Sequence, residues 1–176
     1  MSLKILSINV RGFGTPAKCN LVLRELECLN YDLFILQETH VSSKQQADGI
    51  ARLWPGQCFW SFGRGRSAGV ALFVSPRFSG QVSRFLFDSD GRVISALVLS
   101  ESNRFNIVNV YAPNTVYECK TFFENLHNYF ISQGDLIVAG DLNCVDNVLD
   151  QIMNIWHSYI WTAEWRNKCK EDPRSY

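Results

Sequence analysis

The chain has 176 residues, of which 47% are hydrophobic and 13% aromatic, so it is long and apolar enough for one globular domain with a sizeable core. Its 17 Lys and Arg residues balance its 17 Asp and Glu residues. This balance excludes the strongly basic footprint of a protein that binds nucleic acid mainly through bulk charge. An enzyme that binds phosphate through a metal ion and a few local Arg residues stays open, because such a site needs little net charge.

The cysteines indicate a reduced protein. Six Cys are scattered without C-x-x-C spacing, and the three His do not complete a zinc pattern. We therefore expect packed, reduced thiols in an intracellular protein. The N-terminus leads straight into a predicted strand, which argues against a signal peptide, and no apolar run approaches the roughly 18 residues that span a membrane.

The chain begins with a predicted strand, a helix and a second strand. Residues 3–10 are predicted to form the first strand, and Thr15 followed by Pro16 is a typical helix start. The second strand is predicted at residues 32–36, two positions before Glu38. This order predicts a right-handed crossover and a parallel pair, so Asn9 and Glu38 should lie at the same edge of the sheet. The helix should bury a face that consists of Cys19, Val22, Leu26 and Leu29.

A short helix and a glycine-rich segment follow. Residues 42–45 resemble a capping box that opens a helix to about Leu53, and residues 58–62 are predicted to form a strand. Residues 63–69 read Gly-Arg-Gly-Arg-Ser-Ala-Gly, which has neither the G-x-G-x-x-G nor the P-loop spacing. We interpret this segment as a hairpin connection that carries two exposed arginines. If the substrate is a nucleic acid, Arg64 and Arg66 are candidate contacts to its backbone.

The middle of the chain is predicted to be rich in antiparallel strands. A buried strand is expected at residues 69–75 and further strands at residues 81–87, 93–100 and 104–111, with turns at residues 88–91 and 100–103. A meander between two strand–helix units predicts a mixed α/β sandwich, neither a doubly wound sheet nor a barrel.

The last predicted unit is a helix and a strand. Pro113 enforces a departure from the strand that ends at Tyr111, and Asn114 or Thr115 should cap the helix. The strand at residues 136–139 reads as buried and central, and it ends in Gly140. The helix should bury an apolar face made of Cys119, Phe122, Phe123, Leu126, Tyr129 and Phe130.

Polar side chains follow three of the predicted strands. Asn9 and Arg11 follow the first, Glu38 the second, and Asp141 and Asn143 the last. Carboxylate and amide oxygens are the ligands that Mg²⁺ prefers, so these strand ends could form a metal site. Alternatively, each is an ordinary strand with a solvated polar end.

Four motifs, in order, carry a resemblance to a known family. They read Ser-Ile-Asn-Val-Arg-Gly at residues 7–12, Leu-Gln-Glu-Thr-His at 36–40, Asn-Val-Tyr-Ala-Pro-Asn at 109–114 and Ala-Gly-Asp-Leu-Asn at 139–143. The chain resembles the DNase I-like endonuclease/exonuclease/phosphatase superfamily over residues 3–150. Its motif sequences are most similar to those of the endonuclease of LINE-type retrotransposons. The resemblance implies a layered α/β sandwich of mixed β-sheets flanked by helices.

The resemblance also implies a reaction and roles for the motif residues. The family relationship suggests a Mg²⁺-dependent phosphodiester hydrolase that nicks DNA, with Mn²⁺ as a possible substitute. By this resemblance Glu38 would be the main metal ligand, with Asn9 beside it, and Asp141 would position or deprotonate the attacking water. Tyr111 and Asn114 would contact the scissile phosphate or the leaving group, and Asn143 would hold the phosphate. The candidate contacts to the DNA backbone are Arg11, Arg64 and Arg66. His40 also matches the family motif, and the resemblance implies that it is a neighbour that shapes the site.

One departure from the family pattern affects the expected activity. The family carries a later Asp motif and a C-terminal Ser-Asp-His, and this sequence contains neither. We expect residues 1–150 to be a partial family domain, with only the N-terminal part of the fold, and residues 151–176 to be a divergent tail of a truncated or rearranged reading frame. Since a missing general acid or base typically costs about 10²–10⁴-fold in rate, the chain should be impaired or inactive.

Two alternatives remain at this point. The chain could be a phosphatase of the same superfamily that acts on a small or lipid phosphate ester, or a non-catalytic fragment that binds nucleic acid or protein. The resemblance makes DNA the expected partner, allows a reverse transcriptase domain in the parent reading frame, and suggests the nucleus as the location.

Overall fold

The computed structural model describes residues 3–64, 68–101 and 103–143. The elements, in chain order, are β1 (Ile5–Asn9), α1 (Pro16–Cys28), β2 (Leu33–Gln37), α2 (Lys44–Ala51), β3 (Gln57–Ser61), β4 (Val70–Val74), β5 (Gln81–Phe87), β6 (Val93–Ser100), β7 (Asn103–Tyr111), α3 (Val116–Asn125), the 3₁₀ helix η1 (Leu126–Tyr129) and β8 (Asp135–Asp141).

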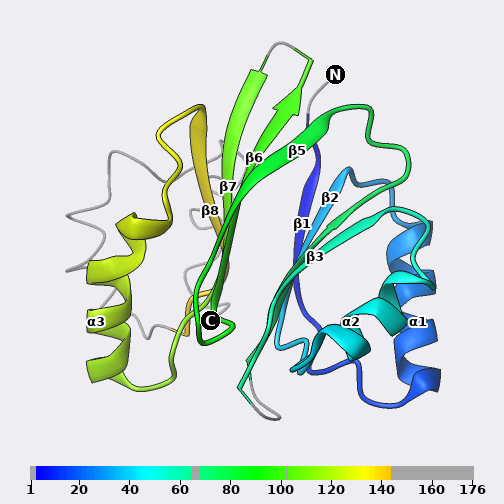
Figure 1. Cartoon of the computed structure of the whole chain (residues 1–176), viewed down its shortest axis with the longest axis horizontal. Helices are drawn as coiled ribbons and strands as arrows, with labels where there is room; N and C mark the ends of the chain where they lie inside the picture. Colours follow the sequence, from blue (N-terminus) through cyan, green and yellow to red (C-terminus); the bar gives the residue numbers. More distant parts are fainter. Residues whose placement is uncertain (1–2, 65–67, 102, 144–176) are drawn as a thin grey trace, which may run out of the picture.

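The strands form two mixed sheets that face each other. The first sheet has the order β1-β2-β4-β3 and the second the order β5-β6-β7-β8. The pairs β1–β2 and β7–β8 are parallel, and the other pairs are antiparallel. Helices α1 and α2 cover the outer face of the first sheet and α3 lies outside the second, which gives four layers (Figure 1). The predicted mixed α/β sandwich is confirmed.

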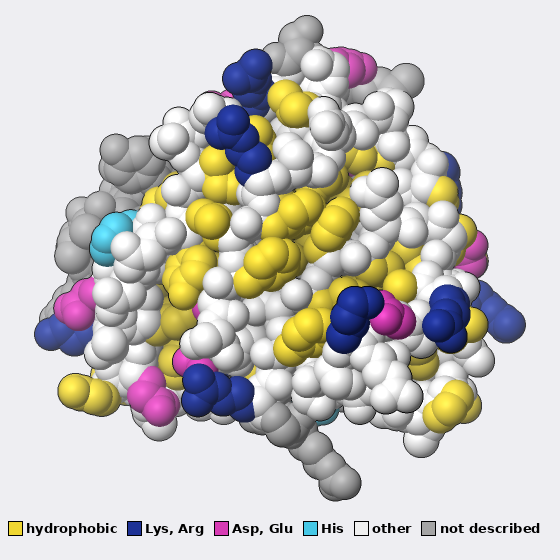
Figure 2. All heavy atoms as spheres, viewed as in Figure 1, with side chains coloured by type: hydrophobic (Ala, Val, Ile, Leu, Met, Phe, Trp, Pro, Cys, Tyr) yellow, Lys and Arg dark blue, Asp and Glu magenta, His cyan; other side chains and the backbone are white. Residues whose placement is uncertain are grey.

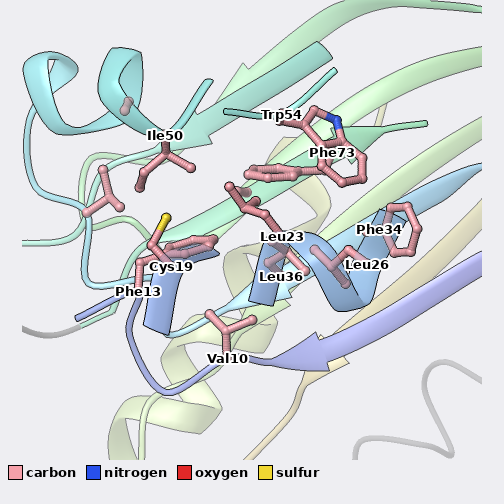
Figure 3. Close-up of a cluster of buried hydrophobic side chains, with 13 residues drawn as sticks. Val10, Phe13, Cys19, Leu23, Leu26, Phe34, Leu36, Ile50, Trp54 and Phe73 are labelled. Carbon is pink, nitrogen blue, oxygen red and sulfur yellow. The ribbon is translucent and has the colours of Figure 1, made fainter. Parts of the chain in front are cut away.

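Apolar side chains fill the three spaces between these layers. In β2, Leu33 and Ile35 point into the space between the sheets, whereas Phe34 and Leu36 point toward the helices. Because side chains alternate along a strand, a strand that is covered on both faces is apolar throughout, and all five residues of β2 are buried. The cluster beneath α1 and α2 is shown in Figure 3 and includes Leu23, Leu26, Phe34, Trp54 and Phe73.

Helix α1 begins as predicted but buries a slightly different face. Thr15 caps it and Pro16 occupies its first turn. Cys19 and Leu26 are buried, but Leu23 replaces Leu29, which is 37% exposed because α1 ends at Cys28. In α2 the capping residue is Ser43 rather than Ser42, since Ser43 Oγ accepts from the backbone N–H of Gln46. The predicted capping box was therefore wrong by one residue.

Strand β8 is less buried than its apolar sequence predicts. It is the last strand of its sheet in the described part of the chain, and its residues are half-buried apart from the exposed Asp135. Ile137 and Ala139 still pack against the core between the sheets. The predicted strand is confirmed, but its central position is not found among the described residues.

A buried polar network joins the two sheets close to the end of β2. The side-chain amide of Asn109 on β7 donates to the carbonyls of Leu36 and Ala71 on the opposite sheet, over 3.0 and 2.9 Å. The side-chain oxygen of Asn109 accepts from Gln37 Nε2 at 2.7 Å, and this Gln37 nitrogen also donates to Ser7 Oγ at 3.2 Å. Because buried amides need partners, this network fixes how β7 lies against β1 and β2.

Cys19, Cys28 and Cys58 are free thiols. Burial raises the pKa of the Cys58 thiol to about 12 and also raises the pKa of Cys19, so both are inert side chains that pack in the core. Within the described ranges, no helix combines the length and the apolar character needed to cross a membrane.

Candidate active site

Four strand ends meet at one edge of the sandwich. In the first sheet Asn9 is paired with Gln37, so Glu38 follows directly beside the end of β1. In the second sheet Tyr111 is paired with Asp141, at the ends of β7 and β8. The two parallel pairs thus bring an amide, a phenol and two carboxylates to the same rim, as expected from strands that end together.

The side chain of Asn9 connects the two sheets at this rim. Its Nδ2 donates to Glu38 Oε1 at 3.0 Å and to Asp141 Oδ2 at 2.8 Å. The hydroxyl of Tyr111 donates to the same Glu38 oxygen at 3.0 Å. The structure therefore brings together Asn9, Glu38, Tyr111 and Asp141, which the sequence analysis selected as site residues.

The backbone reverses sharply at several site residues. Arg11, Glu38 and Asn143 have φ angles of 49°, 50° and 46°, which lie in the left-handed region that residues other than glycine rarely adopt. The carbonyl of Glu38 accepts from the N–H of Gly12, and the N–H of Thr39 donates to the carbonyl of Gly69 at 2.9 Å. Such conformations cost energy, and the neighbouring loops here hold them in place.

Tyr111 lies in an environment that keeps it protonated. Burial, the hydrogen bond to Glu38 and the negative charges of Glu38 and Asp141 raise the pKa of Tyr111, and these effects outweigh the lowering effect of the Arg92 charge. The phenol is thus a hydrogen-bond donor at neutral pH.

His40 lies beside Glu38. Its Nε2 is 3.8 Å from Glu38 Oε2, and the Glu38 side chain is 24% exposed. Gly12 packs against the imidazole, because a Cβ added at Gly12 would lie 2.6 Å from His40 Nδ1. His40 therefore borders the site without closing it.

The other predicted residues occupy the rim. Asn143 Nδ2 donates to the carbonyl of Ala112 at 2.7 Å, and its backbone N–H donates to Asp141 Oδ1 at 3.2 Å. Asn114 is exposed between β7 and α3, and the exposed Arg11 donates its backbone N–H to Asn9 Oδ1 at 3.0 Å.

The predicted arginine pair lies in the connection between β3 and β4. Arg64 Nη2 forms an ion pair with Asp90 Oδ1 at 2.7 Å, and its side chain is 76% exposed. Arg66 lies outside the described residues. β3 and β4 pair antiparallel, so this segment is the hairpin connection that its sequence predicted.

The sequence analysis did not select Gln37, Asn109 or Arg92. Gln37 and Asn109 lie inside family motifs, and their inward direction follows only from the pleat, which puts Gln37 on the face of Ile35 and Asn109 on the face of Tyr111. Arg92 follows an Asp-Gly turn and has no distinguishing sequence signal. The structure places it against Tyr111, with Cζ 5.4 Å from the centre of the ring.

The donors at this rim fit a hard metal ion. Two carboxylates lie so close that one amide nitrogen hydrogen-bonds to both. The described residues contain no group of three or more His, Cys, Asp or Glu that could hold a metal on its own. Mg²⁺ is commonly held by one or two carboxylates, with water and phosphate oxygens in its remaining positions.

Comparison with known proteins identifies the family. The sequence profile of the endonuclease/exonuclease/phosphatase family matches residues 6–167. The match runs past residue 150, and the predicted domain boundary there stays a prediction. A Transposon TX1 uncharacterized 149 kDa protein from Xenopus laevis is 32% identical over 146 residues, which are 81% of this chain and 11% of the relative. This likeness to a transposon protein agrees with the resemblance to the retrotransposon branch.

Solved structures share the fold. The catalytic domain of Xenopus laevis APE2 matches with a TM-score of 0.65 and 20% identity, over 81% of this chain and 59% of that one. The 3′ phosphatase NExo from Neisseria, bound to a product DNA hairpin, matches with a TM-score of 0.61 and 20% identity, over 81% of this chain and 58% of that one. The chain thus spans less than two thirds of the proteins that it matches, and its two sheets correspond to part of their DNase I-like fold. The chain belongs to the endonuclease/exonuclease/phosphatase family of hydrolytic nucleases and phosphatases.

Proposed function

We propose that the site hydrolyses phosphodiesters with Mg²⁺, or Mn²⁺ in its place, and that its substrate is DNA, which it nicks. The observation that carries this proposal is the single Asn9 amide that donates to both Glu38 and Asp141. It holds two carboxylates at one rim, beside a protonated phenol, and hydrolysis of a phosphodiester needs such a set of oxygen donors and hydrogen-bond donors. Members of the family generally depend on divalent metals, which supports the choice of ion.

The chemistry divides between the two carboxylates. Glu38, with Asn9 beside it, would hold the metal, which when bound would neutralise charge on the phosphate oxygens. Asp141 orients the attacking water and takes its proton. Tyr111 donates a hydrogen bond at the phosphate rim because it stays protonated. Asn114, Asn143, Arg11, Arg64 and Arg66 would hold the phosphate and the DNA backbone.

The proposal includes a low rate for this chain. The Ser-Asp-His motif does not occur in its sequence, and loss of a group that moves protons costs about 10²–10⁴-fold. The likeness to a transposon protein supports a retroelement origin, a reverse transcriptase domain in the parent reading frame, and action on chromosomal DNA in the nucleus.

Mg²⁺ binding is the first test of the site. Calorimetric titration of Mg²⁺ into the full chain should show one site that is lost in Glu38→Ala and in Asp141→Ala. Asp48→Ala is the matched control, because Asp48 lies on α2 in an exposed ion pair with Lys44 at 2.8 Å. No binding to the wild-type chain, or equal binding to all variants, contradicts the metal site.

Nicking of supercoiled plasmid is the second test. We expect slow, Mg²⁺-dependent conversion to open circles that EDTA, Glu38→Ala and Asp141→Ala abolish and that Asp48→Ala leaves unchanged. Release of phosphate from a small or lipid phosphate ester without nicking would favour the phosphatase alternative. DNA binding without cleavage would favour the non-catalytic fragment, and rapid nicking would show that the missing motifs are dispensable.

A further inference from the structure

We propose that Arg92 is a positioning residue, which holds the Tyr111 side chain so that its hydroxyl reaches Glu38. The inference rests on the proposed function, because Tyr111 belongs to that site. It adds a residue that touches neither carboxylate, and it makes the turn between β5 and β6 part of the site's support.

Three contacts join Arg92 to Tyr111. The backbone N–H of Tyr111 donates to the carbonyl of Arg92 at 2.8 Å, one step beyond the pairing of Val93 with Val110. Arg92 Nη1 donates back to the Tyr111 carbonyl at 3.3 Å. The guanidinium carbon lies 5.4 Å from the ring centre, within the range of a cation–π contact. The backbone of Tyr111 and its ring are thus both held by one residue.

These contacts between Arg92 and Tyr111 matter because β7 ends at Tyr111. The ring has two side-chain torsions, and only some of their combinations bring its hydroxyl to Glu38 Oε1, where it lies at 3.0 Å. Ala112 still donates its backbone N–H to the carbonyl of Asp141 at 2.8 Å, and Pro113 and Asn114 lie beyond the strand. A cation against one face of the ring restricts the side-chain torsions of Tyr111 at this strand end.

Arg92 is itself held by a tight turn. Asp88 Oδ1 accepts from the backbone N–H groups of Arg92 and Val93, each at 2.9 Å, and from Ser61 Oγ at 2.9 Å. Because Ser61 is the last residue of β3, a single carboxylate ties this turn to the first sheet.

Gly91 brings the same turn close to the loop that follows β3. Its φ is 70°, and a Cβ there would overlap the backbone of Phe62 and Gly63. Its carbonyl accepts from the N–H of Gly69 at 2.9 Å. Arg92 therefore projects from a fixed base, as a positioning residue must.

Arg92→Met and Arg92→Lys test the inference. Met keeps much of the length and loses the charge and the donors, whereas Lys keeps the charge and loses the planar fork. Arg104→Met is the matched control, since Arg104 is an exposed arginine near the other end of β7. In single-turnover plasmid nicking we expect Arg92→Met to lower the rate about 10-fold with unchanged DNA affinity, and Lys to restore part of it.

A double-mutant cycle separates positioning from general support of the fold. If Arg92 acts through the Tyr111 hydroxyl, Arg92→Met should have no further effect on the rate in the Tyr111→Phe background. Additive losses would overturn the inference.

A readout without catalysis covers the case in which nicking is too slow to measure. In a chain with ¹³C-labelled tyrosine rings, the Tyr111 signal (assigned by its loss in Tyr111→Phe) should move in Arg92→Met and stay in place in Arg104→Met. An unmoved Tyr111 signal in a folded Arg92 variant would overturn the inference while leaving the proposed function intact. Absent Mg²⁺ binding would contradict the proposed function and leave the ring measurement to decide on Arg92.

Discussion

The amide nitrogen of Asn9 lies 2.8 Å from Asp141 Oδ2, although 132 positions separate the two residues in the sequence. This contact crosses from the first sheet to the second, and the same nitrogen also donates to Glu38. It therefore offsets the repulsion between two carboxylates that would otherwise face each other at a half-buried rim. The two carboxylates are therefore kept close together by the amide of a neutral residue, Asn9.

Replacing that amide by a carboxylate should make the site depend on a cation. In Asn9→Asp two hydrogen bonds are lost and a third negative charge is added, so without divalent ions the free energy of unfolding should fall by about 1–3 kcal/mol. Saturating Mg²⁺ should then stabilise the variant more than the wild type, because only the folded state gathers the three carboxylates. Urea unfolding in EDTA and in Mg²⁺ measures both effects.

The control for this variant is Asn128→Asp. Asn128 lies exposed on η1, and its side-chain amide donates to the nearby carbonyl of Asn125 at 3.0 Å. Its replacement should change stability little and by the same amount in both buffers. If Asn9→Asp behaved like this control, Asn9 would not separate the two carboxylates.

Asn109 should be among the most sensitive polar residues of the fold. Asn109→Ala removes the buried donor to the carbonyls of Leu36 and Ala71, while Gln37 Nε2 keeps its bonds to Ser7 and Ile35. Since each unsatisfied buried group costs about 1–3 kcal/mol, we expect a loss of roughly 3 kcal/mol or more in the free energy of unfolding. The result is measured by chemical unfolding of the wild type and the variant.

Asn106 is a matched buried control for Asn109. It is fully buried on the same strand, but it bonds to Ser95 and Ile131 and not to the opposite sheet. Asn106→Ala should therefore destabilise the chain without changing Mg²⁺ binding, whereas Asn109→Ala should weaken both. Equal effects of the two variants on Mg²⁺ affinity would argue against a role for Asn109 in aligning the sheets.

The strands were the most predictable part of this fold. β5 and β6 were predicted with their observed bounds, because each is a run of β-forming residues between turns rich in Gly, Asp and Ser. The parallel pairing of β1 and β2 followed from the helix between them. Local sequence rules determine such features, so a single sequence suffices to predict them.

Features that depend on packing between distant elements were not predictable in this way. The burial of Leu23 instead of Leu29 depends on where α1 ends against the sheet. The role of Ser43 rather than Ser42 in capping α2 depends on the approach of the preceding loop. Arg92 lies against Tyr111 after a turn in which Asp88 accepts from its backbone N–H, and neither contact has a local sequence signal. The predicted strand ends already pointed to Asn9, Glu38 and Asp141, whereas the selection of Tyr111 and the roles of all four residues came from the resemblance to a family.

Tyr111 should make stability fall at alkaline pH. Its folded-state pKa is raised above the ordinary value of 10.0, first by burial and then by Glu38, so the folded chain holds the proton more tightly than the unfolded chain. Its contribution to stability is complete below that ordinary value and is lost as pH rises through the raised value. Unfolding at about pH 8 and about pH 10.5 should show a smaller alkaline loss for Tyr111→Phe than for the wild type.

Tyr129 is the comparison for this pH effect. Its pKa is also raised, by burial and then by the charges of Asp88 and Asp90. Tyr129→Phe should therefore reduce the alkaline loss as well, but only Tyr111→Phe should slow Mg²⁺-dependent nicking, because only that variant removes a hydroxyl bonded to Glu38. An unchanged alkaline loss in Tyr111→Phe would contradict the raised pKa.

Gly140 should be irreplaceable because it places Asp141 at the end of β8. Its φ is 144°, and a Cβ there would overlap the backbone carbonyl of Val110 on the neighbouring strand β7. Gly140→Ala must therefore push β8 away from β7 or distort the turn into Asp141. We expect a loss of about 2 kcal/mol or more in the free energy of unfolding, together with weaker Mg²⁺ binding, measured by urea unfolding and calorimetry.

Gly49 supplies the opposite case in the same chain. It lies within α2, and a Cβ there would meet nothing within 4 Å. Because glycine is a poor helix residue, Gly49→Ala should stabilise the chain by about 0.5–1 kcal/mol and leave Mg²⁺ binding unchanged. If Gly140→Ala were as well tolerated as Gly49→Ala, β8 would not pack against β7 as described. The alignment of Asp141 with Asn9 and Glu38, on which the proposed chemistry depends, would then be wrong.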